Sequence, residues 1–184
     1  MEAVAQINEA LAMSPGDAAL CVQGGGMYLE MGLFDDADRL AREAVKASPG
    51  SSSAWHLRGQ VSLARGQAEP ALADFHRALA IDPAERSVLL DTADAYRRLD
   101  RPQRALATLA VLGETYGPNQ TPAAVLVLEG LAQEALGREA DAVESYRAAL
   151  VRDGSATEAA SRLAALVPQE AQATAARPGV APRR

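Results

Sequence analysis

Cysteine, lysine and aromatic residues are scarce in this 184-residue sequence, and each scarcity excludes a class of protein. Cys21 is the single cysteine, so no disulfide can form within the chain. Lys46 is the single lysine, and the net charge of −6 argues against an electrostatic surface for nucleic acid. The longest apolar run, residues 123–128, is far too short to cross a bilayer. We therefore expect no nucleic-acid partner and no membrane contact.

The first residues contain neither the basic nor the apolar region of a secretory signal, so we expect a cytoplasmic protein. Hydrophobic residues nevertheless make up 48% of the chain, whereas aromatic residues make up 4%. Alanine supplies much of the apolar total, and small side chains bury enough area only where helix backbones approach closely. The composition therefore indicates a core built on close contact between helices.

The residues that could carry chemistry do not form a recognisable site. His56 and His76 are the only histidines, and neither has a cysteine or carboxylate at metal-ligand spacing. Cys21 falls in a column of core positions, where a thiol acts as a small apolar group. The Gly24–Gly26 run lacks the preceding strand and the following Gly-Lys-Ser/Thr or spaced glycine of a phosphate-binding loop. We expect no metal, no cofactor and no catalysis.

Small residues recur along the sequence at a nearly constant spacing. Gly25, Gly59, Ala93 and Gly130 are separated by 34, 34 and 37 residues. The same intervals separate the alanines at positions 37, 71, 105 and 142, and a further column at positions 44, 78, 112 and 149. A period of 34 is typical of arrays of helix pairs. The three extra residues of the last interval fall near Gly117, where a loop accommodates them.

Each repeat is predicted to form two helices. In the second repeat, the serines at 51–53 offer N-capping hydroxyls for a first helix over 54–64. Gly66 suits the left-handed conformation that ends a helix, and Asp82-Pro83 ends the second helix. The position of Gly66 is held in the other repeats by Gly32, Asp100 and Gly137.

This pattern resembles the tetratricopeptide repeat family, whose signature combines tryptophan, glycine, alanine, phenylalanine and proline at fixed positions. The resemblance implies an all-α, right-handed superhelical solenoid of antiparallel helix pairs, because no single pair can bury its apolar stripe alone. The structural repeat positions are then Gly25, Ala37, Trp55, Gly59, Ala71, Phe75, Ala78, Pro83, Ala93, Ala105, Gly130 and Ala142.

The resemblance also sets the expected boundaries of one repeat domain over residues 1–166. A half-repeat, four full repeats and a capping helix are expected at 1–15, about 18–49, 52–83, 86–118 and 123–154, and 155–166. The alanine- and proline-rich residues 167–184 are expected to be a disordered tail. In the half-repeat, Ile7 and Leu11 are expected to leave an apolar strip exposed, through which two copies could associate.

By the same resemblance, a partner is expected to bind in a concave groove lined by the first helix of each repeat. The residues expected to line it are Val22, Gly26, Leu29, His56, Gln60, Leu63, Leu90, Asp94, Arg97, Val127 and Leu131. Most are apolar, and the lysine and asparagine clamp of some co-chaperone relatives is absent. Such a surface suits an amphipathic helix or an extended apolar peptide.

The function predicted from the sequence is that of a non-catalytic scaffold or adaptor that binds a protein or peptide partner. Two alternatives stay open. One is the regulatory or substrate-recruiting portion of a larger enzyme of the glycosyltransferase, sulfotransferase or hydroxylase type. The other is an adaptor for pilus assembly or another process in a bacterial envelope. Whether the natural reading frame continues into a catalytic domain distinguishes the first alternative from the scaffold.

Overall fold

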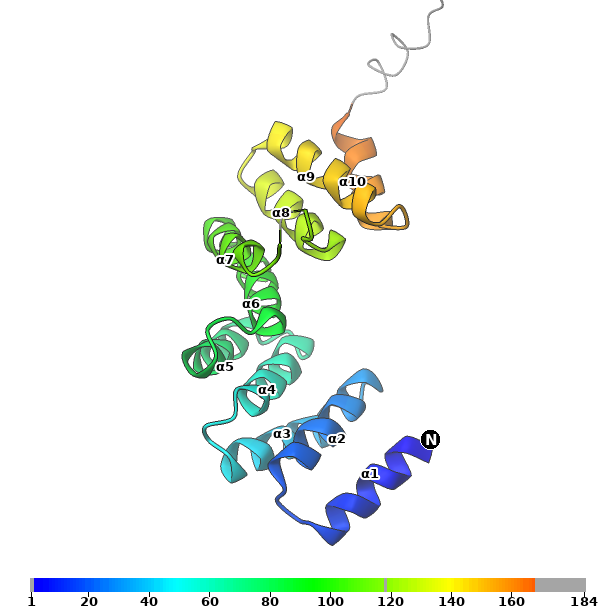
Figure 1. The fold of residues 1–184 in the computed structure, drawn as a ribbon, viewed down its shortest axis with the longest axis vertical. Coiled ribbons are helices and arrows are strands. Elements are labelled where there is room, and N and C mark those ends of the chain that lie inside the picture. The colour runs from blue at the N-terminus through cyan, green and yellow to red at the C-terminus, as the bar shows by residue number, and fades with distance from the viewer. Residues whose placement is uncertain (1, 118, 168–184) are drawn as a thin grey trace, which may run out of the picture. The chain divides into compact units, whose positions relative to one another are not determined.

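The fold is entirely helical over the part of the chain that the computed structural model describes, residues 2–117 and 119–167 (Figure 1). Ten α-helices and no strand occur in these ranges. The chain divides into two compact units, Met1–Gly117 and Pro118–Arg184, each considered separately below. The division falls in the loop that holds the three extra residues. The predicted all-α class is confirmed, and the single domain over 1–166 stays a prediction.

The first unit contains seven helices. They are α1 (Glu2–Met13), α2 (Ala18–Glu30), α3 (Phe34–Ala47), α4 (Ser52–Ala64), α5 (Ala68–Ile81), α6 (Arg86–Arg98) and α7 (Pro102–Glu114). Helices α2 and α3, α4 and α5, and α6 and α7 form pairs, and α3 packs against α4 as α5 packs against α6. Among α2, α4 and α6, the first helices of the three pairs, α4 lies next to both α2 and α6. We call these three the A helices.

The second unit consists of α8 (Ala123–Ala135), α9 (Glu139–Arg152) and α10 (Thr157–Leu166). Helices α8 and α9 form a pair of the same kind, and α10 packs against α9. Ala159 of α10 is buried with Ala142, Tyr146 and Ala149 of α9, and Leu163 and Leu166 pack against this cluster. Helix α10 therefore covers the apolar stripe that α9 would otherwise expose, as expected for a capping helix.

Turn residues at the helix ends follow the sequence prediction. Gly32, Gly66 and Gly137 have φ of +73°, +76° and +70°, the left-handed region that glycine adopts without a steric penalty. Asp100 holds the same position with φ of 55°. At the start of α4, the Ser51 hydroxyl accepts a hydrogen bond from the Ala54 amide at 3.3 Å. These features set short connections between antiparallel helices.

Glycine allows close contact between helices at three places: within a pair at Gly59 and Gly130, and between the neighbouring A helices α2 and α4 at Gly25. A Cβ atom on Gly59 would lie 2.4 Å from the Phe75 ring and 3.2 Å from the Ala71 carbonyl oxygen. A Cβ on Gly130 would lie 2.4 Å from the Tyr146 ring, and one on Gly25 would lie 2.6 Å from Leu57. Real Cβ atoms essentially never approach other atoms this closely. Phenylalanine and tyrosine thus pack directly onto the backbone of the facing helix.

Most of the remaining structural repeat positions lie in the core of their own units. Fully or almost fully buried are Ala37, Ala71, Phe75, Ala78, Ala93, Ala105 and Ala142. Pro83 is exposed and lies just after the end of α5. Trp55 is half-buried, and its indole N–H donates to the Pro49 carbonyl oxygen at 2.7 Å.

One expectation about the chain ends changes, and the other is not tested. Ile7 is only 6% exposed, because its side chain contacts the backbone region of Gly24 in α2. Leu11 is half-buried beside the cluster around Cys21 and Leu40. The predicted exposed strip of Ile7 and Leu11 is therefore wrong, since α2 covers it. Of the expected disordered tail, residues 168–184 lie outside the described residues.

Candidate functional site

The candidate site is the surface of the first unit where α4 lies next to α2 and α6, which we call the A-helix face. The sequence analysis assigns to it three residues from each helix: Val22, Gly26 and Leu29 of α2, His56, Gln60 and Leu63 of α4, and Leu90, Asp94 and Arg97 of α6. All except Leu63 are half-buried in the structure. Half-buried side chains keep part of their area exposed to solvent, and a partner can cover that area.

Leu63 is the exception. Its side chain is 7% exposed, so it belongs to the core and offers little area to a partner. Helical periodicity places Leu63 on the same stripe as His56 and Gln60, but α6 packs next to α4 at this point. The guanidinium of Arg98 in α6 reaches the Leu63 carbonyl oxygen at 3.5 Å. We therefore leave Leu63 out of the A-helix face.

A polar cluster joins α4 to α6 across this face. The Nε2 atom of His56 lies 2.7 Å from Asp91 Oδ2, and the Gln60 amide donates to the same oxygen at 2.8 Å. An ionised carboxylate only accepts hydrogen bonds, so the Nε2 tautomer of His56 is the one that can donate to Asp91. The sequence analysis placed His56 and Gln60 here but missed Asp91, which is one position from the predicted stripe. The repeat period of 34 leads from His56 to Leu90, so no spacing in the sequence points to Asp91.

Two arginines of α6 converge on Asp94. The Arg97 guanidinium donates to Asp94 Oδ1 from Nη2 at 2.7 Å and from Nε at 3.0 Å. Arg98 donates from Nε to Asp94 Oδ2 at 2.7 Å. These contacts are local, since the three residues lie within one helical turn. They hold the Arg97 guanidinium in a fixed orientation on the A-helix face.

The apolar part of the face comes from α2 and α6. Val22 and Leu29 are half-buried, each packed at one edge of a core cluster, and Leu90 is half-buried on α6. Gly26 lies between Val22 and Leu29, and a Cβ added there would meet no atom within 4 Å. Packing within the described residues therefore does not require glycine at this position, unlike at Gly24 and Gly25. The face is open at Gly26.

Val127 and Leu131 belong to the second unit. Both are half-buried and pack at the edge of the cluster formed by Ala142, Tyr146, Ala149 and Ala159. Glu134 lies one turn further along α8. Its carboxylate accepts a hydrogen bond from the Tyr146 hydroxyl at 2.5 Å and forms an ion pair with Arg162 at 3.5 Å. Burial, followed by the hydrogen bond to Glu134, raises the pKa of Tyr146 above its usual range. These contacts link α8 to both α9 and α10.

Comparison with known proteins identifies the architecture. A family model described as tetratricopeptide repeat matches residues 87–117, which form α6 and α7. Tetratricopeptide repeat protein 33 of Mus musculus is 31% identical over 103 residues, a match that covers 56% of this chain. The chain contains a tetratricopeptide repeat at residues 87–117 and has the fold of this family. The match covers 39% of the mouse protein, so this tetratricopeptide repeat (TPR) chain corresponds to well under half of that relative's length.

Solved structures of other TPR proteins have the same fold. The Pseudomonas aeruginosa protein pilF superposes with a TM-score of 0.77 at 22% identity, covering 85% of this chain and 70% of that one. YrrB, described as a TPR protein with an unusual peptide-binding site, superposes with a TM-score of 0.70 at 18% identity, covering 87% and 81%. TPR proteins generally act as interaction scaffolds for protein or peptide partners and are typically non-catalytic.

The cysteine of this TPR chain is buried in the core, and its histidines form hydrogen bonds. Among the described residues, no three His, Cys, Asp or Glu side chains are grouped so that they could hold a metal ion. Cys21 is fully buried, and burial, reinforced by Glu43, raises the pKa of its thiol. His76 pairs with the Tyr96 hydroxyl at 2.9 Å. None of the helices within 2–117 and 119–167 is long and apolar enough to span a membrane.

Proposed function

We propose that this TPR protein is a non-catalytic scaffold that binds a peptide or helix of a partner protein on the A-helix face of residues 2–117. The observation that carries the proposal is the composition of this face. Half-buried apolar side chains from α2 and α6 lie beside a polar cluster that is already oriented by its own hydrogen bonds. A partner can bury the apolar area without first ordering the polar groups, which lowers the entropic cost of binding.

The face favours an amphipathic segment over a purely charged one. Val22, Leu29 and Leu90 offer apolar area, whereas Asp91 and Arg97 offer an acceptor and a donor. The gap at Gly26 admits the backbone of a bound segment close to α2, because no side chain stands there. An amphipathic helix or an extended peptide with alternating apolar residues meets these requirements.

The test uses the purified full-length chain as bait, identification of captured proteins by mass spectrometry, and titration of a purified captured partner. Leu90→Asp places a charge among the apolar residues of the face and should weaken binding about tenfold or more. Val151→Asp is the matched control, because Val151 is 85% exposed and belongs to α9, which is not one of the A helices. Circular dichroism checks that both variants keep their helix content.

Equal affinity of the Leu90→Asp variant and the unmodified chain would rule out the A-helix face as the binding surface. Equal weakening by Val151→Asp and Leu90→Asp would also contradict the proposal, since the effect would then come from charge alone. Leu63 is unsuitable for this experiment, because a charge at a position that is 7% exposed disrupts the core.

A further inference from the structure

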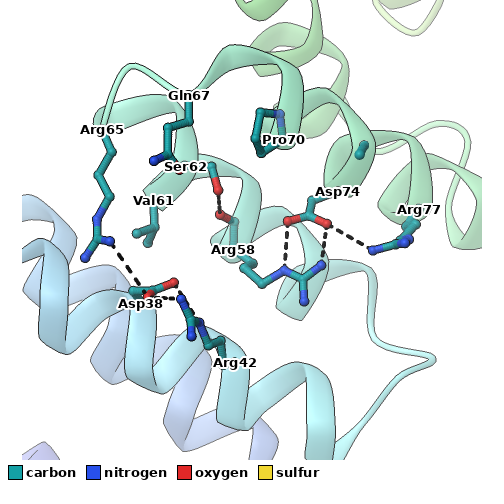
Figure 2. Close-up of a pocket in the computed structure, with 11 residues that line it drawn as sticks. Asp38, Arg42, Arg58, Val61, Ser62, Arg65, Gln67, Pro70, Asp74 and Arg77 are labelled. Atoms are coloured by element: carbon teal, nitrogen blue, oxygen red, sulfur yellow. Dashed lines mark hydrogen bonds and ion pairs between the residues drawn. The ribbon is translucent and has the colours of Figure 1, made fainter.

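A second candidate surface lies on the first unit between α3, α4 and α5, away from the stripe that forms the A-helix face. A pocket of about 420 Å³ opens there, and side chains from all three helices line it (Figure 2). Four of them are arginines: Arg42 of α3, Arg58 and Arg65 of α4, and Arg77 of α5. The carboxylates of Asp38 and Asp74 separate them.

Asp74 fixes two of the four guanidinium groups. Asp74 is 5% exposed, and its carboxylate accepts from Arg58 Nε at 2.8 Å and from Arg58 Nη2 at 2.5 Å. Arg77 Nη1 donates to Asp74 Oδ1 at 3.3 Å. The Cζ atoms of Arg58 and Arg77 also lie 4.5 Å and 4.7 Å from the centre of the Trp55 ring. Hydrogen bonds and cation–π contacts therefore hold both guanidinium groups in place before any ligand binds.

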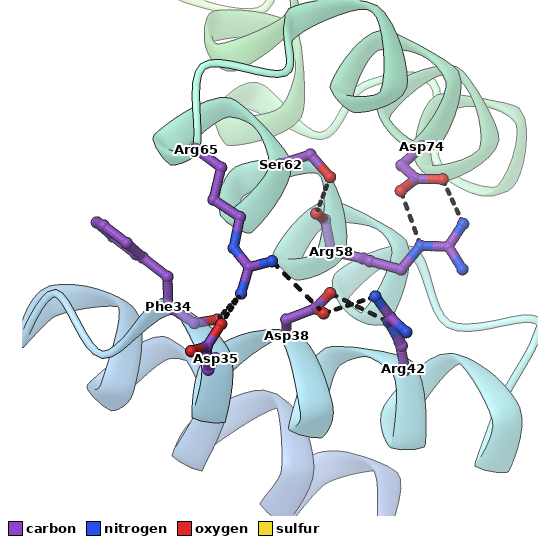
Figure 3. A network of polar contacts seen from close by, with 8 residues as sticks. All are labelled: Phe34, Asp35, Asp38, Arg42, Arg58, Ser62, Arg65 and Asp74. Carbon is purple, nitrogen blue, oxygen red and sulfur yellow. Dashed lines mark hydrogen bonds and ion pairs between the residues drawn. The ribbon is translucent and has the colours of Figure 1, made fainter.

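Asp38 and Asp35 hold the other two arginines (Figure 3). Arg42 Nη2 lies 2.7 Å from Asp38 Oδ2, and Arg65 Nη1 lies 3.9 Å from the same atom. Arg65 Nη2 donates to Asp35 Oδ1 at 2.6 Å and to the Phe34 carbonyl oxygen at 3.0 Å. Helix α3 thereby presents a guanidinium group opposite the pair that Asp74 holds.

The pocket carries an excess of positive charge within an acidic protein. Four guanidinium groups face three carboxylates, Asp35 included, which leaves a local charge of +1, whereas the chain as a whole has −6. Each guanidinium has five N–H donors, and within the described residues Arg77 uses one of them in a hydrogen bond. Arg42 and Arg77 are also the more exposed pair, with side chains 70% and 56% exposed. Donors therefore remain available at the mouth of the pocket.

We propose that this pocket docks an acidic segment of a partner protein, whose Asp or Glu carboxylates bind Arg42 and Arg77. Carboxylates are the groups that these arginines already bind within the chain, and the planar guanidinium matches a carboxylate in a two-point contact. A long nucleic acid is disfavoured, because it must pair a run of consecutive phosphates with cations, and the exposed donors of the pocket come from Arg42 and Arg77. This second surface does not depend on the A-helix face and remains even if binding there is disproved.

The experiment uses the full chain and a fluorescein-labelled, end-blocked hexaglutamate peptide, with hexaglutamine as the uncharged comparison. Fluorescence anisotropy measures binding, and the emission of Trp55, the single tryptophan, reports whether the peptide reaches this pocket. We expect hexaglutamate to bind, hexaglutamine not to bind, and the affinity to fall as sodium chloride rises from about 50 mM to about 300 mM. The double variant Arg42→Gln/Arg77→Gln should bind about tenfold more weakly.

The matched control is Arg39→Gln/Arg104→Gln, which removes the same charge from exposed positions on α3 and α7 outside the pocket. If the control weakens binding as much as the pocket variant, the interaction is a general charge effect and the proposal is overturned. If inorganic phosphate shifts Trp55 emission at the same concentration of anionic groups, the pocket is a small-anion site and docking of a peptide is overturned. Thermal unfolding of both variants confirms that the fold is retained.

Discussion

At the scale of single residues, glycine is required at some positions of this protein and not at others. Gly59 and Gly26 both lie in the middle of an A helix, where glycine costs about 1 kcal/mol relative to alanine. The surroundings differ, because a Cβ on Gly59 would overlap the Phe75 ring and a Cβ on Gly26 would meet nothing within 4 Å. The same substitution should therefore have opposite effects at the two positions.

Gly59→Ala is expected to lower the free energy of unfolding by about 2 kcal/mol, because Phe75 must leave its rotamer or the helices must separate. Gly26→Ala is expected to raise it by about 0.5–1 kcal/mol, because alanine restricts the unfolded chain and no neighbour is displaced. Urea unfolding followed by circular dichroism measures both. A destabilised Gly26→Ala variant would show that this position is packed after all, and a neutral Gly59→Ala variant would show that the α4–α5 contact is loose.

At the scale of helical elements, a clamp formed by Arg58 and Asp74 joins α4 to α5 through a buried carboxylate. Arg58 and Asp74 form a two-point hydrogen-bonded pair, and Asp74 is nearly inaccessible to solvent. In the ion pair of Asp38 with Arg42, Nη2 lies 2.7 Å from Oδ2, which is similar to the distances between Arg58 and Asp74. The Arg42 side chain, however, is 70% exposed. An exposed pair four residues apart contributes little, whereas loss of one partner from a buried pair leaves an uncompensated charge.

Asp74→Ala is therefore expected to destabilise the first unit by about 3 kcal/mol, and Asp38→Ala by less than about 1 kcal/mol. Chemical denaturation with a probe in this unit, such as Trp55 fluorescence, distinguishes the two. Equal effects of the two substitutions would mean that burial of the Asp74 carboxylate contributes nothing to the strength of the clamp.

Helices and turns were predictable because they depend on local sequence. The serines before α4, the glycines after α2, α4 and α8, and Asp82-Pro83 after α5 define ends that the structure reproduces within a few residues. The contacts of Asp91 and the burial of Leu63 were not predictable in this way. Both depend on how α6 lies against α4, and one residue of register decides which side chain reaches the neighbouring helix. The burial of Ile7 was missed for the same reason, since it depends on the close approach of α2 at Gly24.

At the scale of the whole molecule, the division into two compact units determines how a local defect spreads. Each unit has its own buried aromatic residue against a glycine, Phe75 on Gly59 in the first and Tyr146 on Gly130 in the second. In an array of repeats, stability is the sum of the stability of each repeat and the coupling to its nearest neighbours. A substitution confined to one unit should therefore act mainly within that unit.

Tyr146→Ala tests this. The side chain is completely buried, and its removal takes away both the packing on Gly130 and the hydrogen bond to Glu134, a loss of about 3–5 kcal/mol. Hydrogen exchange measured by mass spectrometry should show that amides of α8, α9 and α10 lose protection while those of α4 and α5 keep theirs. The Val151→Asp variant, altered on the exposed side of α9, should leave protection unchanged throughout. If Tyr146→Ala instead removes protection uniformly from α4 to α10, the chain unfolds as one cooperative body, and coupling across residues 117–122 must be as strong as the packing inside each unit.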